Sequence, residues 1–90
     1  MSKTAAVTGA ASGIGQAACR RLLEAGWIVY GLDSARDRLL SVANDYAQFQ
    51  DRFRPFPCDI ADAGQVANAF ERIGTVSPAL NALVTCAGVL

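Results

Sequence analysis

The chain has 90 residues, of which 52% are apolar and eight are glycine, so it suits one packed domain and is not typical of a disordered protein. Eight basic and eight acidic residues balance, which argues against a nucleic-acid-binding face, and the lack of histidine excludes an imidazole base or metal ligand. Three cysteines without a Cys-x-x-Cys pair predict neither a zinc site nor a disulfide framework. No signal-peptide region or membrane-length apolar run is found, so we expect a cytoplasmic protein without a membrane partner or metal.

Short apolar runs alternate with segments of helical period in the first half of the chain. Residues 4–8 predict a buried strand, and a helix is expected from Gly13 to Ala25, with Gly26 in the left-handed position that ends a helix. Residues 27–32 predict a second strand, and Ser34 is expected to cap a helix that runs to about Gln48. The predicted inner faces are Ile14, Ala17, Ala18 and Leu22 in the first helix and Leu39, Val42, Ala43 and Tyr46 in the second.

The second half continues the alternation. Residues 53–58 predict a third strand, whose two prolines favour the edge of a sheet because proline cannot donate a hydrogen bond. Asp62 and Gln65 form a capping-box-like start for a third helix, which Gly74 is expected to end. The predicted inner face of that helix is Val66, Ala69, Phe70 and Ile73. Residues 82–86 predict a fourth strand.

This order of elements predicts an α/β fold. Strands that alternate with helices through short links favour parallel strands and right-handed crossovers. We expect a Rossmann-like doubly wound parallel sheet of about four strands, in the order 3-2-1-4, with three helices. Residues 1–90 would then form a single, partial dinucleotide-binding domain.

A glycine-rich loop lies between the first strand and the first helix. Gly9, Gly13 and Gly15 have the spacing Gly-x-x-x-Gly-x-Gly, and no acidic residue lies between Thr4 and Arg20. Free N–H groups and the dipole at a helix start attract a pyrophosphate, and a Cβ would obstruct its approach or the φ angles of the turn. Three glycines are also consistent with a tight turn alone, but this location favours phosphate binding. The candidate residues are Gly9, Ser12, Gly13, Ile14 and Gly15.

Two carboxylates follow at strand ends. Asp33, at the end of the second strand, is placed to accept hydrogen bonds from ribose hydroxyls and would repel a 2′-phosphate, which favours NAD over NADP. A solvated strand end or a helix cap is the other interpretation of Asp33, and Arg36 nearby keeps NADP as the alternative cofactor. Asp59, after the third strand, can meet the exocyclic amine of an adenine, although alone it is equally consistent with a turn.

Together these residues resemble the short-chain dehydrogenase/reductase family of the classical type. The family's TGxxxGIG loop matches residues 8–15 at every fixed position, and Asp33 corresponds to the acidic residue of its NAD-preferring members. Asp59 and Ile60 resemble its adenine-contacting pair. Ala87 and Gly88 match the end of its Asn-Asn-Ala-Gly motif, in which Thr85 and Cys86 replace the asparagines. The resemblance implies that Asp59, Ile60, Ala87 and Gly88 contact the cofactor.

The resemblance also implies hydride transfer between NAD and an alcohol or carbonyl substrate. The family's catalytic Ser and Tyr-x-x-x-Lys have no counterpart here, because Lys3 is the only lysine and neither Tyr30 nor Tyr46 has a lysine four residues on. We therefore expect no catalytic residue in this chain, which would be the truncated, cofactor-binding half of an oxidoreductase and inactive alone. An exposed fourth strand predicts a homo-oligomer, most simply a dimer. The alternative is a stand-alone nucleotide-binding or self-assembling module without catalysis.

Overall fold

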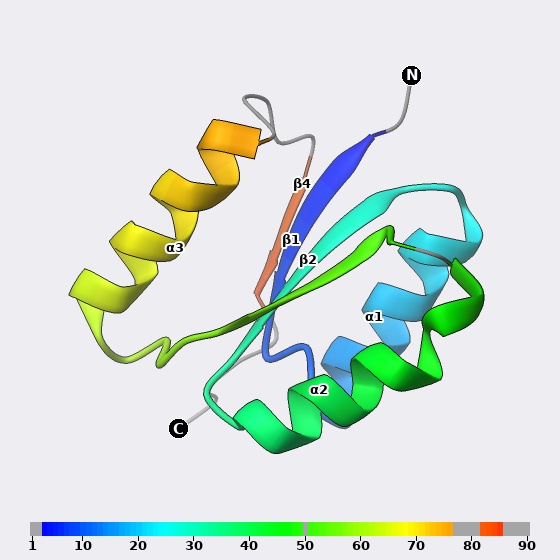
Figure 1. The fold of residues 1–90 in the computed structure, drawn as a ribbon, viewed down its shortest axis with the longest axis horizontal. Helices are drawn as coiled ribbons and strands as arrows, with labels where there is room; N and C mark the ends of the chain where they lie inside the picture. Colours follow the sequence, from blue (N-terminus) through cyan, green and yellow to red (C-terminus); the bar gives the residue numbers. More distant parts are fainter. Residues whose placement is uncertain (1–2, 50, 77–81, 86–90) are drawn as a thin grey trace.

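The computed structural model describes residues 3–49, 51–76 and 82–85. The chain alternates strands and helices, as the periodicity of the sequence predicts (Figure 1). The elements are β1 (Thr4–Thr8), α1 (Gly13–Glu24), β2 (Ile28–Asp33), α2 (Arg36–Asp45), the short 3-10 helix η1 (Ala47–Phe49), β3 (Phe53–Pro57), α3 (Ala63–Val76) and β4 (Ala82–Thr85).

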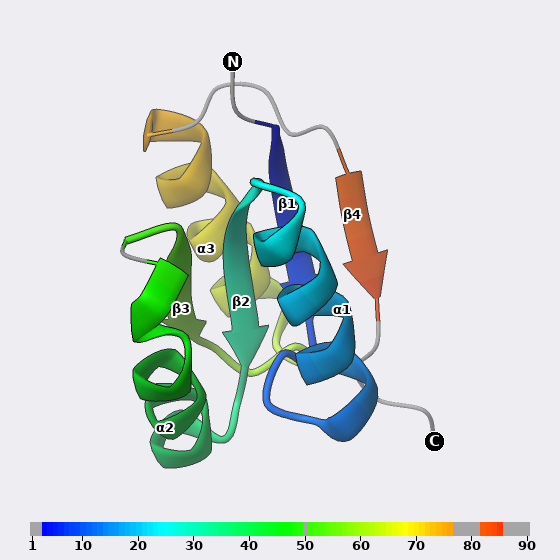
Figure 2. The same cartoon turned by 90° about the vertical axis from the view of Figure 1, so that its right-hand side faces the viewer.

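The strands form one parallel sheet in the order β3-β2-β1-β4. Helices α1 and α2 cover one face of this sheet and α3 covers the other (Figures 1 and 2). This confirms the predicted doubly wound α/β fold and its strand order. The register places Thr8 opposite Leu32 and Thr85, and Asp33 opposite Pro57, so the four strands end at one common edge. Residues that follow the strands are therefore brought together at this edge.

The core has two halves because a doubly wound sheet is covered on both faces. Strand β1 is buried at every position, in agreement with the continuous apolar run of Ala5, Ala6 and Val7 between its two terminal threonines. The buried cluster beneath α1 and α2 comprises Val7, Ala10, Ala11, Cys19, Leu23, Val29, Leu39, Val42, Tyr46 and Phe53. The cluster beneath α3 comprises Ala6, Tyr30, Leu32, Cys58, Ala69 and Ile73.

The predicted inner face of α1 is wrong at two positions. Ile14 is 75% exposed and Ala17 is also exposed, whereas the buried residues of the helix are Gly15, Cys19 and Leu23. These three residues recur every four positions and turn the helix so that Gly15 lies against the glycine loop. The spacing of the apolar residues could not show this rotation, since a glycine contributes to close packing through its small size.

Two of the helix ends that the sequence predicts are confirmed, and two are wrong. Gly26 has a φ of +93° and follows α1 as predicted, and Asp62 Oδ1 accepts hydrogen bonds from the N–H groups of Gly64 and Gln65 at the start of α3. The predicted Ser34 cap is wrong, because Ala35 is the N-cap residue of α2 and provides no side-chain hydrogen bond. Gly74 does not end α3, which continues to Val76.

The prolines of β3 have a particular orientation at the sheet edge. The Cys58 N–H donates to the carbonyl of Asp33 in β2, so alternate residues before Cys58 turn their N–H positions away from β2. Pro55 and Pro57 occupy these outward positions, where they remove the donors that a further strand would need. The two prolines therefore disfavour pairing of a further strand at this edge of the sheet.

Candidate functional site

The glycine loop bends sharply at the edge where the strands end. Gly9 has a φ of +69°, in the left-handed region that favours glycine. Ser12 Oγ donates to the Gly9 carbonyl at 2.7 Å and accepts a hydrogen bond from the Gly15 N–H at 3.1 Å. Ser12 is thus the N-cap of α1, a role that the sequence analysis did not assign to it.

Gly13 and Gly15 serve different purposes in the loop. A Cβ at Gly15 would collide with the Gly9 carbonyl, so Gly15 allows the helix to approach the end of β1. A Cβ at Gly13 would meet nothing within 4 Å, so the fold itself does not need glycine there. Among the described residues, no acceptor is assigned to the backbone N–H groups of Gly13 and Ile14, and the first turn of α1 holds no acidic residue. This helix start fits an anionic group.

Asp33 joins the end of β2 to the glycine loop. Its Oδ2 accepts a hydrogen bond from the Ala11 N–H at 3.0 Å, and its Oδ1 accepts one from the Ala35 N–H at 2.8 Å. The side chain is half-buried, and each carboxylate oxygen has a second lone pair for a further hydrogen bond. The structure therefore brings Asp33 together with the loop, as the fold class predicts. Both backbone contacts also make Asp33 a structural element of the turn into α2.

Asp59 and Ile60 lie next to Asp33 at the same edge. The Asp59 carboxylate is exposed and accepts a hydrogen bond from the Ala61 N–H at 2.9 Å, so it organises the turn before α3. Ile60 is half-buried and packs against the core cluster beneath α3. Burial raises the pKa of the preceding Cys58 thiol, and the carboxylates of Asp59 and Asp33 raise it further. The predicted contacts Ala87 and Gly88, like Cys86, lie outside the described residues.

Two residues absent from the predicted site support the loop. Gln16 Nε2 donates to the Ala11 carbonyl at 3.0 Å, and Tyr46 Oη donates to the Gln16 carbonyl at 2.9 Å. The pKa of Tyr46 is raised, mainly by burial. In the sequence, a glutamine directly after the loop is only a weak indication of a supporting role. The hydrogen bond from Tyr46 could not be predicted from the sequence, because its partner Gln16 lies 30 residues away in the chain. These contacts depend on how α2 packs against α1.

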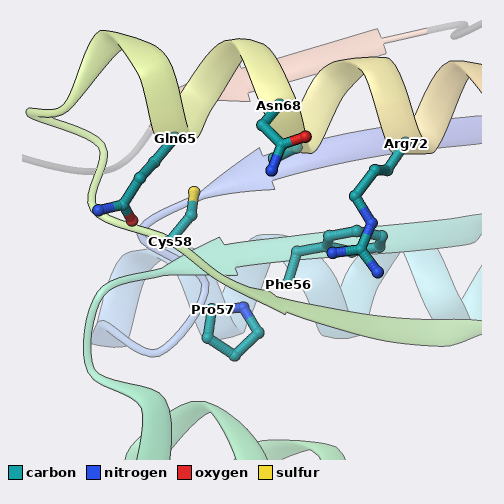
Figure 3. A pocket seen from close by; sticks show the side chains of 7 residues that line it. Phe56, Pro57, Cys58, Gln65, Asn68 and Arg72 are labelled. Atoms are coloured by element: carbon teal, nitrogen blue, oxygen red, sulfur yellow. The ribbon is translucent and has the colours of Figure 1, made fainter.

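A small groove lies away from the loop, between β3 and α3. Its volume is about 120 Å³, and its lining consists of Phe56, Pro57, Cys58, Gln65, Asn68, Ala69 and Arg72. Asn68 and Arg72 reach into the groove from α3 (Figure 3). The Arg72 guanidinium lies 5.7 Å from the centre of the Phe56 ring. Gln65 Oε1 accepts a hydrogen bond from the Asp59 N–H, so this side chain is already engaged. Of the predicted site residues that the structure describes, none lines the groove.

No helix within residues 3–49, 51–76 and 82–85 is both long and apolar enough to cross a membrane. The same segments hold no cluster of three or more His, Cys, Asp or Glu side chains suited to a metal ion. Cys19 and Cys58 are buried, and neither is disulfide-bonded.

Comparisons with known proteins agree with this architecture. The family model for short chain dehydrogenases matches residues 3–90. A probable NADP-dependent dehydrogenase of Haemophilus influenzae is 37% identical over 96% of the chain, and the 2,3-dihydro-2,3-dihydroxybenzoate dehydrogenase of Escherichia coli is 39% identical over 93%. Among solved structures, the menthone neomenthol reductase of Mentha piperita superposes with a TM-score of 0.91 at 29% identity, over 99% of this chain and 32% of that one. The chain spans 33% and 30% of the lengths of the two curated relatives, about a third.

Proposed function

The chain belongs to the short-chain dehydrogenase family, and we propose that it is the NAD-binding portion of an oxidoreductase that transfers hydride between NAD and an alcohol or carbonyl substrate. Members of this family bind nicotinamide dinucleotides. The observation that carries the proposal is the Asp33 carboxylate, which is hydrogen-bonded to a glycine loop at the start of α1. A carboxylate suited to a ribose and a helix start suited to an anion thus lie side by side, which supports the proposal of a dinucleotide site.

The proposed contacts with the phosphates and the ribose come from α1 and β2. The N–H groups of Gly13 and Ile14 are suited to the pyrophosphate, because they lie at the positive end of the α1 dipole and the space beside Gly13 is open. The remaining lone pairs of Asp33 suit the ribose hydroxyls. For the adenine we propose Asp59 and Ile60, with Ala87 and Gly88 as further contacts. Gly9, Ser12 and Gly15 shape the loop without the need for direct contact.

The charge of Asp33 supports NAD as the cofactor. A 2′-phosphate would lie against a carboxylate whose two oxygens already point at the loop and at Ala35. Arg36, exposed in the first turn of α2, is the candidate for a compensating cation, and two curated relatives are named as probable NADP-dependent dehydrogenases. NADP is therefore the alternative that a titration must distinguish.

The proposed role of this chain is binding and orientation. When bound, the dinucleotide supplies the hydride acceptor or donor, and the residues named here hold it at the edge where the strands end. General acid–base help from a Tyr-x-x-x-Lys pair has no candidate among these 90 residues, so we expect no turnover by the chain alone. Binding without turnover is also what a stand-alone nucleotide-binding module would show, and joining the chain to the remainder of a relative distinguishes the two.

The cofactor preference is tested by removing the charge of Asp33. Asp33→Asn loses the negative charge and one of the two oxygens that accept backbone N–H groups, so NAD binding should weaken by at least about 1 kcal/mol, or roughly fivefold in Kd. The ratio of NAD to NADP affinity reports the charge, because a disturbed loop would weaken both dinucleotides. We expect weaker NAD binding and a smaller NAD-to-NADP ratio of affinities, measured by calorimetric titration. Asp45→Asn makes the same change at the exposed end of α2 and should leave both affinities unchanged. An unaltered ratio for Asp33→Asn would reject Asp33 as the determinant.

We further infer that the chain self-associates through the β4 edge. The prolines of β3 disfavour strand pairing at the opposite edge, and among the described residues β4 is paired only with β1. An open edge strand is a template for a second copy, and a two-fold dimer would cover it. Light scattering at micromolar concentration should give the mass of a dimer, and a monomer would contradict this inference.

A further inference from the structure

We propose that Gln16 is a positioning residue for dinucleotide binding, because its side chain and that of Asp33 clamp the two sides of Ala11 in the glycine loop. The proposal rests on the proposed function, since it concerns the same site. The proposed role of Gln16 involves no direct contact with the cofactor. It acts by fixing the backbone that leads into the start of α1.

The clamp holds both backbone groups of Ala11. Asp33 Oδ2 accepts the Ala11 N–H at 3.0 Å, and Gln16 Nε2 donates to the Ala11 carbonyl at 3.0 Å. Ala11 is only 2% exposed, so solvent has little access to replace either bond. A buried backbone carbonyl that loses its partner is costly, and the loop would relax to satisfy it elsewhere.

Gln16 is itself fixed from two directions. Its N–H donates to the Ser12 carbonyl at 2.8 Å, in the first helical hydrogen bond of α1, and its carbonyl accepts the Tyr46 hydroxyl at 2.9 Å. Tyr46 is buried at the C-terminal cap of α2 and packs edge-on against Phe53 at 5.1 Å between ring centres. The amide that holds Ala11 is therefore carried by a backbone that the core restrains.

The position of Ala11 matters because it links the two proposed binding groups. Ala11 precedes Ser12, whose hydroxyl sets the geometry of the turn from Gly9 to Gly15. A rotation of the Ala11 backbone would therefore disturb the N–H groups offered to the pyrophosphate. It would also break the bond to Asp33 and free the carboxylate that is proposed to hold the ribose. Loss of the Gln16 donor should therefore weaken binding of both the pyrophosphate and the ribose.

The test replaces the donor while keeping the length of the side chain. Gln16→Met removes the donor, Gln16→Glu replaces it with acceptors only, and Gln16→Lys restores a donor at similar reach. As a control, Gln48→Met makes the same glutamine-to-methionine substitution at an exposed position of η1. Calorimetry should show NAD binding about three- to tenfold weaker for Gln16→Met, as expected for one hydrogen bond. Gln16→Glu should bind at least as weakly, whereas Gln16→Lys and Gln48→Met should stay within about twofold of the parent.

A second readout separates positioning from a general loss of stability. Amide hydrogen exchange of Ala11 should accelerate in Gln16→Met, while the exchange of amides in β1 and β2 stays at the parental rate. Parental NAD affinity in Gln16→Met, with binding by the parent chain intact, would overturn the clamp and leave the proposed function standing. Uniform acceleration of exchange across the sheet would also overturn it, in favour of a purely structural role. If the parent chain does not bind NAD, both the proposed function and the clamp fail.

Discussion

Alanine substitutions at Gly13 and Gly15 should separate ligand binding from folding. At Gly13 a Cβ meets nothing within 4 Å, and the backbone does not have a positive φ, so Gly13→Ala should fold normally. Loss of backbone freedom in the unfolded chain predicts a gain of about 0.5 kcal/mol in the free energy of unfolding. The added methyl group would nevertheless project into the open space where the pyrophosphate is proposed to approach. We therefore expect at least about tenfold weaker NAD binding by a protein that is no less stable.

Gly15→Ala should behave in the opposite way. Its Cβ would lie 2.6 Å from the Gly9 carbonyl carbon and 3.0 Å from Ala10 Cα, and the Gly9 oxygen is closer still. All three are backbone atoms that cannot rotate away. Overpacking of this kind costs about 3 kcal/mol, which corresponds to a fall in Tm of roughly 12 °C or more for a domain of this size.

Urea unfolding followed by the fluorescence of Trp27, the single tryptophan, measures the stability of both variants, and calorimetry measures NAD binding. If Gly13→Ala loses as much stability as Gly15→Ala, the conclusion that the fold leaves open space beside Gly13 is wrong. If Gly13→Ala binds NAD with parental affinity, the pyrophosphate does not approach there, and the assignment of the loop is refuted.

Three further predictions concern the supports of the site and the sheet edge. Tyr46→Phe removes the donor to Gln16 but keeps the ring against Phe53, so urea unfolding should show a loss of about 1 kcal/mol. The pKa of Tyr46 is raised in the folded state, so folding favours the neutral phenol. The resulting contribution to the free energy of unfolding is present below about pH 10 and is lost as the pH rises further. This pH dependence should be absent in the phenylalanine variant. Replacement of Pro55 and Pro57 by threonine restores two outward N–H groups and should increase self-association in light scattering, and an unchanged mass would contradict the role of the prolines at this edge.

The fold was predictable because its signals are local and agree with one another. Alternating apolar runs and helical periods gave the element order, and Gly26 and Asp62 marked helix ends through conformations or caps that depend on neighbouring residues. The edge position of β3 followed from the missing donors of its prolines. These are effects of backbone chemistry that tertiary packing does not override.

The predictions that were wrong concern features that depend on tertiary packing. Ile14 is apolar yet exposed, because the close approach of Gly15 to Gly9 sets the rotation of α1. Ser34 lost its predicted capping role because Asp33, one residue earlier, accepts the N–H of the turn into α2. The bond between Ala11 and Asp33 joins residues 22 positions apart, so only the folded sheet brings them together. Local patterns cannot reveal such contacts.

The central claim is that the glycine loop and Asp33 form a dinucleotide site that prefers NAD. Calorimetric titration of the 90-residue chain with NAD, and with NADP in parallel, tests it most directly. We predict saturable binding of one NAD per chain, with clearly weaker binding of NADP. Absence of binding by either dinucleotide would contradict it, and the loop would then serve only the turn between β1 and α1.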